Sequence, residues 1–518
     1  MRGFGGLSRK LVLLVWGMWI LGVYVQVPVC AASGQGMAAL GEYTDENGVI
    51  YAYSKSNMDH ISIIGISNYE GKIVDIPAEI DGYPVIELNF MMNSAAVAEL
   101  HIPEKVTSMK ESVFADTDIG ILYYKARQME TEGAGNAFKN ARIGELVIGA
   151  DVQVIPVKAF QEAQFLQEKV VLNVKTVGKM AFYGAEMNEL AVTDQVEFIG
   201  DNAFALGHIK RLEWDANVET ELPGAYNYRG IFYSANVSEI SWGNNTKSIP
   251  EYMFYKACIG MEELEIDVET IGGYAFCENQ GIKRLTLGEH VRNIGFHSFA
   301  YSGITEVEFN SVDAYIPQWD NPLAINFPEY PFHENTLTNI SIGDQVTIIP
   351  NYLFGGVIFQ VEELEFPDSL TEIGIQSFSN MDTTMKGISS LVIGENVKKI
   401  GSSAFWRWDI GTLFYNAREA EVAGDYPFYV SCIRDFRIGE EVAVLPSRLL
   451  SKVQIDLDML VIPDNVVKIE DDLMYGETKS DKRIGTVEIG GKVSYIGKRA
   501  FGDIVIDRMV VHAVTGYP

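Results

Sequence analysis

Hydrophobic positions recur along the chain in units of about 22 to 24 residues. Glu145–Phe160 and Ser390–Phe405 follow the same order: two apolar residues separated by one residue, a second apolar pair, a glycine or proline, and a closing phenylalanine. Apolar residues at i and i+2, as in Leu264 and Ile266, have the spacing of a half-buried strand. One unit cannot cover such a face alone, so we expect successive units to stack and their strands to align in one long parallel sheet.

The closing apolar residue anchors each unit. Most anchors are 22 to 24 residues apart, with longer steps before Phe232, Phe332, Phe405 and Phe501. At about 4.8 Å per strand, some 17 coils would form a sheet roughly 80 Å long. The 18 anchors are Phe90, Phe114, Phe138, Phe160, Phe182, Phe204, Phe232, Phe254, Phe276, Phe299, Phe332, Phe354, Phe378, Phe405, Phe428, Leu450, Met474 and Phe501.

The second apolar pair of each unit, such as Val196 and Ile199, stands before a glycine or proline that turns the chain. The phenylalanine that follows then closes the core. The pattern predicts a β-rich α/β repeat solenoid, a superhelix with short strands, one long parallel sheet and helical turns.

The unit resembles the BspA-type leucine-rich repeat of bacterial surface proteins. The resemblance rests on Ile102-Pro103 with Val106, Ile462-Pro463 with Val466, and Ile496-Gly497 with Ala500-Phe501, and it covers about residues 70 to 518. The chain lacks the asparagine that usually lines the turn in the wider leucine-rich family, as is normal for this branch. The resemblance implies an extracellular solenoid that attaches to host or matrix proteins or to other cells, and it supplies no catalytic residue.

The N-terminus has the layout of a secretory leader. Arg2, Arg9 and Lys10 precede the apolar run Leu11–Val25, and the small pair Ala31-Ala32 offers a cleavage site. The run of about 15 residues is shorter than the roughly 20 of a membrane-spanning helix, so a membrane anchor is the alternative and the mature chain should contain no membrane span. We therefore expect a secreted or cell-surface protein.

The chain divides into three expected parts: a signal peptide at 1–32, an N-terminal cap at 33–70, and a solenoid of about 17 to 18 repeats at 71–518. Asn47-Gly48 predicts a tight hairpin turn within the cap. Met509–Pro518 begins another strand-like unit and lacks a polar capping element.

Cysteines provide no disulfide framework. Cys30 lies in the leader, and the residues before it do not favour lipid attachment. Cys258, Cys277 and Cys432 are an odd number in an exported chain, which leaves at least one thiol unpaired. Cys258 and Cys277 are one repeat apart and could pair, but we expect them as buried free thiols.

Charge excludes one class of partner. Without Arg2, Arg9 and Lys10 the chain has 37 basic and 70 acidic residues, a net charge of −33. Such a chain repels polyanions, so no nucleic-acid partner is expected.

The residue between the two inward strand positions should point to solvent. Five of these outward positions are glutamate, which suggests either a negative strip for a basic partner or cations, or a solvated face whose charge limits aggregation. The 17 positions are His101, Tyr123, Val147, Asn173, Ala191, Glu213, Ser241, Glu265, Thr286, Glu308, Ser341, Glu365, Val392, Phe414, Arg437, Val461 and Glu488.

Aromatic residues form a second set of candidates. The longest inserted segment contains Trp319 and Tyr330, and Trp406 and Trp408 flank Arg407 after an anchor. Exposed tryptophan and tyrosine commonly anchor protein interfaces. The alternative is that these rings cover the convex side of the solenoid.

Catalytic and metal-binding signatures are absent from the sequence. The seven histidines form no His-x-x-x-His pair, and there is no zinc-type cysteine cluster, phosphate loop or calcium loop. No histidine is placed repeatedly near one serine, as a triad would require. We expect a non-catalytic protein without cofactor or metal.

The sequence favours a protein-binding or adhesion solenoid whose partner is a host, matrix or cell-surface protein. The binding candidates are Trp319, Tyr330, Trp406 and Trp408 together with Glu213, Glu265, Glu308 and Glu365. Two alternatives stay open: an accessory region of a longer chain that carries a hydrolytic module, and a spacer that holds another domain away from the cell wall.

Overall fold

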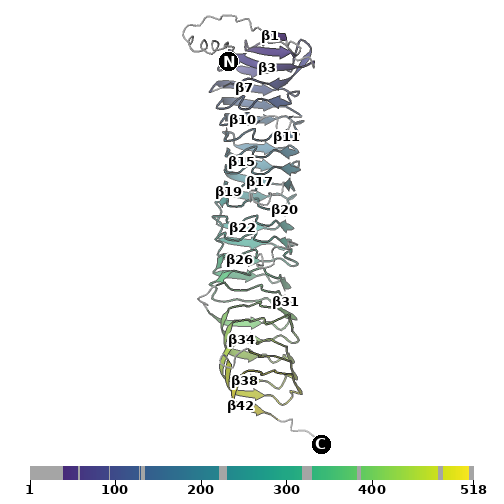
Figure 1. Cartoon of the computed structure of the whole chain (residues 1–518), viewed down its shortest axis with the longest axis vertical. Coiled ribbons are helices and arrows are strands. Elements are labelled where there is room, and N and C mark those ends of the chain that lie inside the picture. Colours follow the sequence, from purple (N-terminus) through teal and green to yellow (C-terminus); the bar gives the residue numbers. More distant parts are fainter. Residues whose placement is uncertain are drawn as a thin grey trace, which may run out of the picture.

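The chain winds into one tall column of stacked rungs, with the N-terminal end at the top and the C-terminal end at the bottom of Figure 1. This computed structural model describes residues 39–55, 59–92, 94–127, 129, 135–220, 230–317, 330–381, 387–476 and 482–512. Strands run across the column and pair with the rungs above and below, almost always in parallel. The predicted β-rich solenoid is confirmed.

An antiparallel hairpin begins the described chain. Asp45 accepts a hydrogen bond from the amide of Gly48 at 3.1 Å, and Gly48 has a φ of 72°, so the predicted turn at Asn47-Gly48 is present. The third strand continues into parallel pairing with the solenoid. The strands of this region are β1 (Ala39–Thr44), β2 (Ile50–Lys55), β3 (Ile61–Ser67), β4 (Ile73–Asp75), β5 (Glu79–Ile80) and β6 (Tyr83–Leu88).

The first apolar pair of each unit lies in a wide sheet on one side of the column. Leu264 and Ile266 point inward and are buried, while Glu265 between them is exposed. The strands of this wide sheet are β7 (Ala96–Ile102), β9 (Asp118–Tyr124), β10 (Arg142–Ile148), β12 (Gln164–Phe165), β13 (Lys169–Leu172), β15 (Glu186–Val192), β17 (His208–Trp214), β19 (Asn236–Trp242), β21 (Cys258–Ile259), β22 (Glu263–Ile266), β24 (Arg284–Leu287), β26 (Glu306–Phe309), β27 (Thr336–Leu337), β28 (Asn339–Ile342), β30 (Ile358–Phe359), β32 (Ile388–Ile393), β34 (Asp409–Tyr415), β36 (Cys432–Ile438), β38 (Gln454–Ile462), β40 (Lys482–Ile489) and β42 (Val505–Val511).

The last residue of the second apolar pair and the residue before it form a narrow sheet that the sequence pattern did not predict. Ile199 and Ile294 are fully buried at the end of strands of two residues, directly before the glycine that turns the chain. The strands of this narrow sheet are β8 (Ser108–Met109), β11 (Val154–Ile155), β14 (Thr176–Val177), β16 (Phe198–Ile199), β18 (Glu219–Thr220), β20 (Ser248–Ile249), β23 (Thr270–Ile271), β25 (Asn293–Ile294), β29 (Ile348–Ile349), β31 (Glu372–Ile373), β33 (Lys399–Gly401), β35 (Glu421–Ala423), β37 (Val444–Leu445), β39 (Lys468–Ile469) and β41 (Tyr495–Ile496).

From Phe114 onward each anchor phenylalanine lies in a turn segment, and no helix is found in the described ranges, so the expected helical turns are replaced by tighter ones. Around Phe160, Lys158 and Glu162 have φ values of 56° and 59°. This left-handed conformation costs about 1 to 2 kcal/mol for a residue with a side chain. Hydrogen bonds to the next rung offset the cost, since the amides of Lys158 and Glu162 donate to carbonyls of Lys179 and Tyr183 at 3.0 and 2.7 Å.

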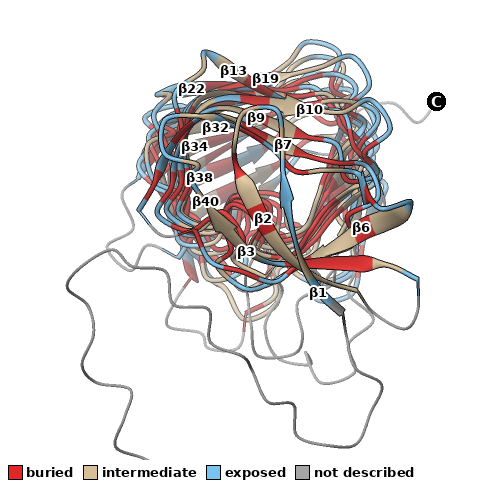
Figure 2. Ribbon diagram, turned by 90° about the horizontal axis from the view of Figure 1, so that it is seen from above, coloured by how far each residue is buried: buried red, intermediate tan, exposed pale blue. Residues whose placement is uncertain are grey.

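The anchors form one continuous column through the core. From Phe90 to Phe428 each ring contacts the next, with centroids 5.0 to 5.6 Å apart, and most pairs lie nearly parallel. Viewed along the column, buried residues line the inside of the coil and exposed residues its outside (Figure 2). Stacking of adjacent rungs therefore buries the apolar face that no single unit could cover.

The wide sheet is not the single uninterrupted sheet that we expected. It is divided into segments, of which the largest contain ten and six strands. Pairing is reduced where a rung has two more residues in its wide strand than the rung before it, because the strands then pair only over their first two residues; at Gln164 and Gln454 these two residues still join the rungs into one segment.

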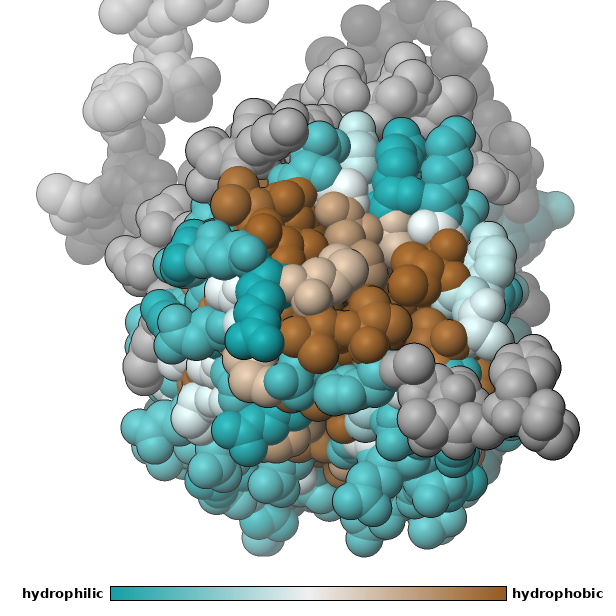
Figure 3. All heavy atoms as spheres, turned by 90° about the horizontal axis from the view of Figure 1, so that it is seen from below, coloured by the Kyte–Doolittle hydropathy of each residue, from teal (hydrophilic) through white to brown (hydrophobic). Residues whose placement is uncertain are grey.

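The last described rung presents apolar side chains at the end of the column. Ile496, Val505, Met509 and Val511 are 47%, 44%, 47% and 62% exposed. Apolar residues gather on this face in Figure 3. Equivalent positions in earlier rungs, such as Ile469 and Ile489, are buried by the following rung.

Candidate binding surfaces

The outward positions of the wide strands form an ordered row. Strand pairing places Glu213 beside Ser241 and joins Glu265, Thr286, Glu308 and Ser341 in that order. Glutamate thus alternates with a hydroxyl residue from rung to rung. The alternation separates like charges that would repel each other directly across a strand pair.

One position of the predicted row is wrong. In strand β13 the inward residues are Val170 and Leu172, so the outward residue is Val171, which pairs with Ala191. The predicted Asn173 lies beyond the end of the strand. The two extra residues in this rung shift the register, which the distance from the anchor does not reveal.

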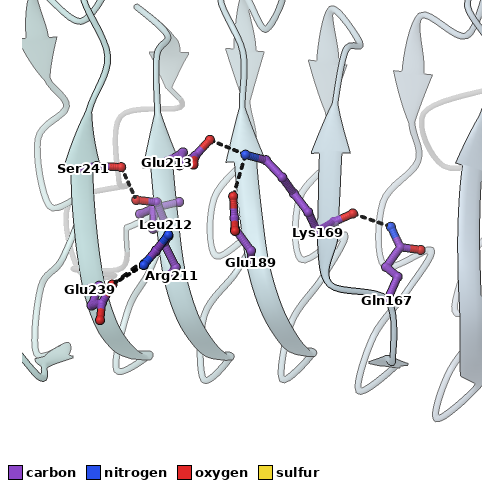
Figure 4. Close-up of polar contacts among 8 residues, drawn as sticks. All are labelled: Gln167, Lys169, Glu189, Arg211, Leu212, Glu213, Glu239 and Ser241. Atoms are coloured by element: carbon purple, nitrogen blue, oxygen red, sulfur yellow. Dashed lines mark hydrogen bonds and ion pairs between the residues drawn. The ribbon is translucent and has the colours of Figure 1, made fainter.

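Glu213 is already neutralised by its surroundings. The ammonium of Lys169 forms ion pairs with Glu213 and, at 2.5 Å, with Glu189, as Figure 4 shows. Partial desolvation lowers the pKa of Lys169, but the hydrogen bonds to Glu189 and Glu213 outweigh it and raise the pKa overall. The same hydrogen bond from Lys169 lowers the pKa of Glu189. This part of the face is a closed charge cluster.

Further along the row, carboxylates without an ion pair are exposed. Two residues before the outward position of each strand, Arg284 lies between Glu263 and Glu306 of the neighbouring rungs and forms ion pairs with both. Glu265 and Glu308 form no ion pair with any described residue, and Glu308 accepts only hydrogen bonds, from Asn310 at 2.9 Å and from Thr286. Exposed Glu365 likewise has no cationic partner in the described chain.

The aromatic candidates do not form one site. Trp319 lies outside the described residues. Tyr330 is half-buried, and its hydroxyl donates a hydrogen bond to Gln376 at 2.5 Å. Trp406 is half-buried, with Arg407 4.9 Å above its ring. The prediction of an exposed ring at Trp408 is wrong: its side chain is 1% exposed, and its indole N–H donates to the carbonyl of Phe378 at 2.7 Å.

Sequence reasoning missed an aromatic column that includes Tyr330. The residues two before successive anchors are Tyr252, Tyr274, His297, Tyr330 and Tyr352. Their rings make a chain of contacts, directly or through His333, with centroids 4.8 to 6.1 Å apart. The signal was available in the repeat register.

A second missed feature is a group of cations above aromatic rings near the C-terminal rungs. Lys452 lies 5.6 and 5.9 Å from the ring centroids of Tyr426 and Tyr475. Arg499 lies 4.6 Å from that of Tyr475 and forms a bidentate ion pair with Asp472. The cations cover ring faces, so these rings present mainly their edges.

The three cysteines of the described chain are free thiols. Cys277 is buried, as expected, and burial raises the pKa of its thiol to about 12. Cys258 is exposed and Cys432 half-buried, so the expectation of burial was wrong for Cys258. Within the described ranges, no group of three or more metal-ligating side chains is found.

Comparison with known proteins identifies the type of the repeat. A family model described as the BspA type leucine rich repeat region matches in six copies, at residues 85–210, 131–231, 226–319, 325–455 and 360–480. No curated protein matches. No helix in the described ranges is long and apolar enough to cross a membrane.

Three solved structures are similar to the chain. The pneumococcal vaccine antigen PcpA is 12% identical, with a TM-score of 0.31, and the match covers 92% of this chain and 99% of that one. A leucine rich cell surface protein from Faecalibacterium prausnitzii is 13% identical (TM-score 0.24, 94% and 97% covered). A leucine-rich repeat protein from Bacteroides ovatus is 14% identical (TM-score 0.25, 90% and 91% covered). These identities are too low to transfer a function.

The family match, unlike these remote likenesses, extends over most of the rungs that stack on the phenylalanine column. The chain therefore belongs to the BspA-type leucine-rich-repeat family.

Proposed function

We propose that this protein is a secreted or cell-surface solenoid that binds a protein of a host, of the matrix or of another cell, without catalysing a reaction. The leader-like N-terminus supports export, and the family supports a surface role. A basic partner fits best, because the outward face carries carboxylates that no cation of the described chain neutralises.

The observation that carries the proposal is the alternating row at Glu265, Glu308 and Glu365. Glu265 and Glu308 are two paired rungs apart, about 10 Å along the column, and Glu365 follows two rungs later, next to Leu364, which forms a bridge to Leu391. Because strand pairing with a neighbouring rung holds the backbone at Glu265 and at Glu308, these positions lose little conformational entropy when a partner docks. Several weak contacts can then act together, and their electrostatic part should weaken as salt is added.

The test compares two variants of equal charge. The mature chain, residues 33–518, is immobilised and titrated with purified extracellular-matrix proteins and with a polylysine probe. E265Q/E308Q/E365Q should bind about tenfold more weakly, since each exposed ion pair contributes modestly. The control E219Q/E289Q/E421Q removes three exposed carboxylates away from the row and should bind as the wild type does. Equal loss in both triple variants would mean that only net charge matters and would refute the row as a site.

A further inference from the structure

Four rungs of the wide sheet are widened by two residues. They are Gln164–Leu172, Cys258–Ile266, Ile358–Phe366 and Gln454–Ile462. Each pairs with the preceding rung over its first two residues and then separates from it. Beyond that point, the backbone groups of the preceding strand that face the widened rung have no strand partner.

In the first two widened rungs a side chain occupies the gap. Gln167 accepts a hydrogen bond from the amide of Leu146. It also donates one to the carbonyl of Lys169 at 2.6 Å, which is drawn in Figure 4. The sulfur of Met261 accepts from the amide of Ile240 at 3.2 Å. Both side chains stand three residues after the start of their rung, and each supplies an acceptor where the next strand is missing.

The fourth widened rung lacks this acceptor. The equivalent residue is Leu457, which is 3% exposed and points into the core, beside Ile484 of strand β40. Strands β36 and β38 pair only at Cys432–Gln454 and Ile433–Ile455. Among the described residues, neither a strand nor a bridging side chain pairs with this edge of β36 at residues 434–438. The third widened rung has Val361 at this position, with the polar Gln360 beside it.

A hollow opens where β36 and β38 separate. It has a volume of about 560 Å³, within the range of ligand pockets. Its lining combines apolar, amide and charged groups, and Arg434 at its rim is held by Asp409 at 2.5 Å. The lining residues are Cys432, Ile433, Arg434, Gln454, Ile455 and Asp456.

We infer that the opening between β36 and β38 is a binding site for an extended peptide segment of a partner protein, held by backbone hydrogen bonds to the free edge of β36. An uncovered strand edge repeats its donors and acceptors with the spacing of another strand, so an extended peptide matches it better than a sugar does. The favoured peptide contains no proline at the pairing positions. It carries an apolar residue at the rungs of Ile433 and Ile455, whose own side chains are buried in the core, and a basic residue toward Asp456, whose side chain is 81% exposed and lies 3.9 Å from the guanidinium of Arg483. This inference deepens the proposed protein-binding function and rests on it.

The half-buried thiol of Cys432 allows a direct test. The probe is the peptide acetyl-Cys-Val-Lys-Val-amide, presented as its mixed disulfide with 2-mercaptoethanol. In the exchange the Cys432 thiolate attacks the peptide sulfur, a new disulfide forms, and 2-mercaptoethanol leaves as its thiolate and takes up a proton. Exposed Cys258 is the internal control, because its rung continues to pair with the following rung, at Cys258–Gln280 and then between β22 and β24, and leaves no comparable edge there. With excess 2-mercaptoethanol at equilibrium, we expect at least tenfold more peptide on Cys432 than on Cys258, measured by peptide mass spectrometry.

Two comparisons separate backbone pairing from simple thiol reactivity. A peptide with N-methylated valines cannot donate backbone hydrogen bonds and should lose the preference for Cys432. The variant L457Q supplies the missing acceptor and should also lose it, whereas L457I supplies none and should keep it. If L457Q does not fold, the comparison with the N-methylated peptide in the wild-type chain still separates backbone pairing from thiol reactivity. Equal capture at both cysteines, or capture unaffected by N-methylation, would overturn the inference.

Peptide trapping at Cys432 does not depend on the glutamate row. The triple variant E265Q/E308Q/E365Q leaves the opening intact and should trap the peptide at Cys432 as the wild type does. Peptide trapping without binding to the matrix proteins would refute the proposed function and leave the opening as a peptide site. Binding to the matrix proteins without peptide trapping would refute the opening as a peptide site and leave the proposed function standing.

Discussion

The close approach of successive rungs at Gly200 yields a sharp prediction. A Cβ atom at this position would lie 2.5 Å from the backbone nitrogen of Lys179 and 2.8 Å from its Cα. Ordinary contacts begin near 3.4 Å, so the backbones would have to separate by about 0.9 Å. The amide of Gly200 is also bonded to the carbonyl of Val177 at 2.8 Å, which resists this separation.

We expect Gly200→Ala to destabilise the protein by about 1 to 3 kcal/mol, the usual cost of overpacking. Gly394 is the matched control, because an added Cβ there meets no atom within 4 Å and its φ is not left-handed. Gly394→Ala should be neutral or stabilise by up to about 1 kcal/mol, since alanine restricts the unfolded chain.

Urea unfolding, followed by circular dichroism, measures the difference in stability, and hydrogen exchange locates it. The Gly200→Ala variant should exchange faster at the amides near Val177 and Gly200, because stacked rungs can open locally. Equal unfolding midpoints for the two variants would refute the reasoning that backbone contact between rungs requires glycine.

Three further predictions concern the core, the turns and pH. Phe204→Ala should lower the free energy of unfolding, measured in urea, by about 3 to 5 kcal/mol, because the ring is 1% exposed and stacks on both neighbours. A loss below about 1 kcal/mol would contradict the stabilising role of the phenylalanine column. Val430 has a φ of 60°, unfavourable for a β-branched residue, so Val430→Asn should raise the melting temperature, whereas Val467→Asn, at a position without left-handed φ, should not. Burial, and then His333, lower the pKa of His297 to about 4 from 6.5. The unfolded chain therefore takes up the proton first, and stability should fall as pH drops from about 6.5 to 4. His297→Gln should flatten this pH dependence, and an unchanged profile would disprove the assignment.

The repeat and its burial pattern could be predicted from the sequence alone. Inward positions such as Leu264 and Ile266, and anchors such as Phe204, are visible as a period, because each rung meets the same neighbours and must bury the same side chains. The outward row followed from the same pattern, since residues between two inward positions point to solvent, except at Asn173, where two extra residues shift the register.

Only the tertiary structure decided how neighbouring rungs differ. The sequence did not separate Trp406, which is half-buried, from Trp408, which is buried, because both follow the same anchor and only packing against Phe378 and Phe405 distinguishes them. The pairing of Glu213 with Lys169, 44 residues away, depends on strand register rather than on local sequence. The opening beside Leu457 exists because a two-residue insertion breaks pairing with the previous rung, and a loss of pairing between strands can be seen only when both strands are in place.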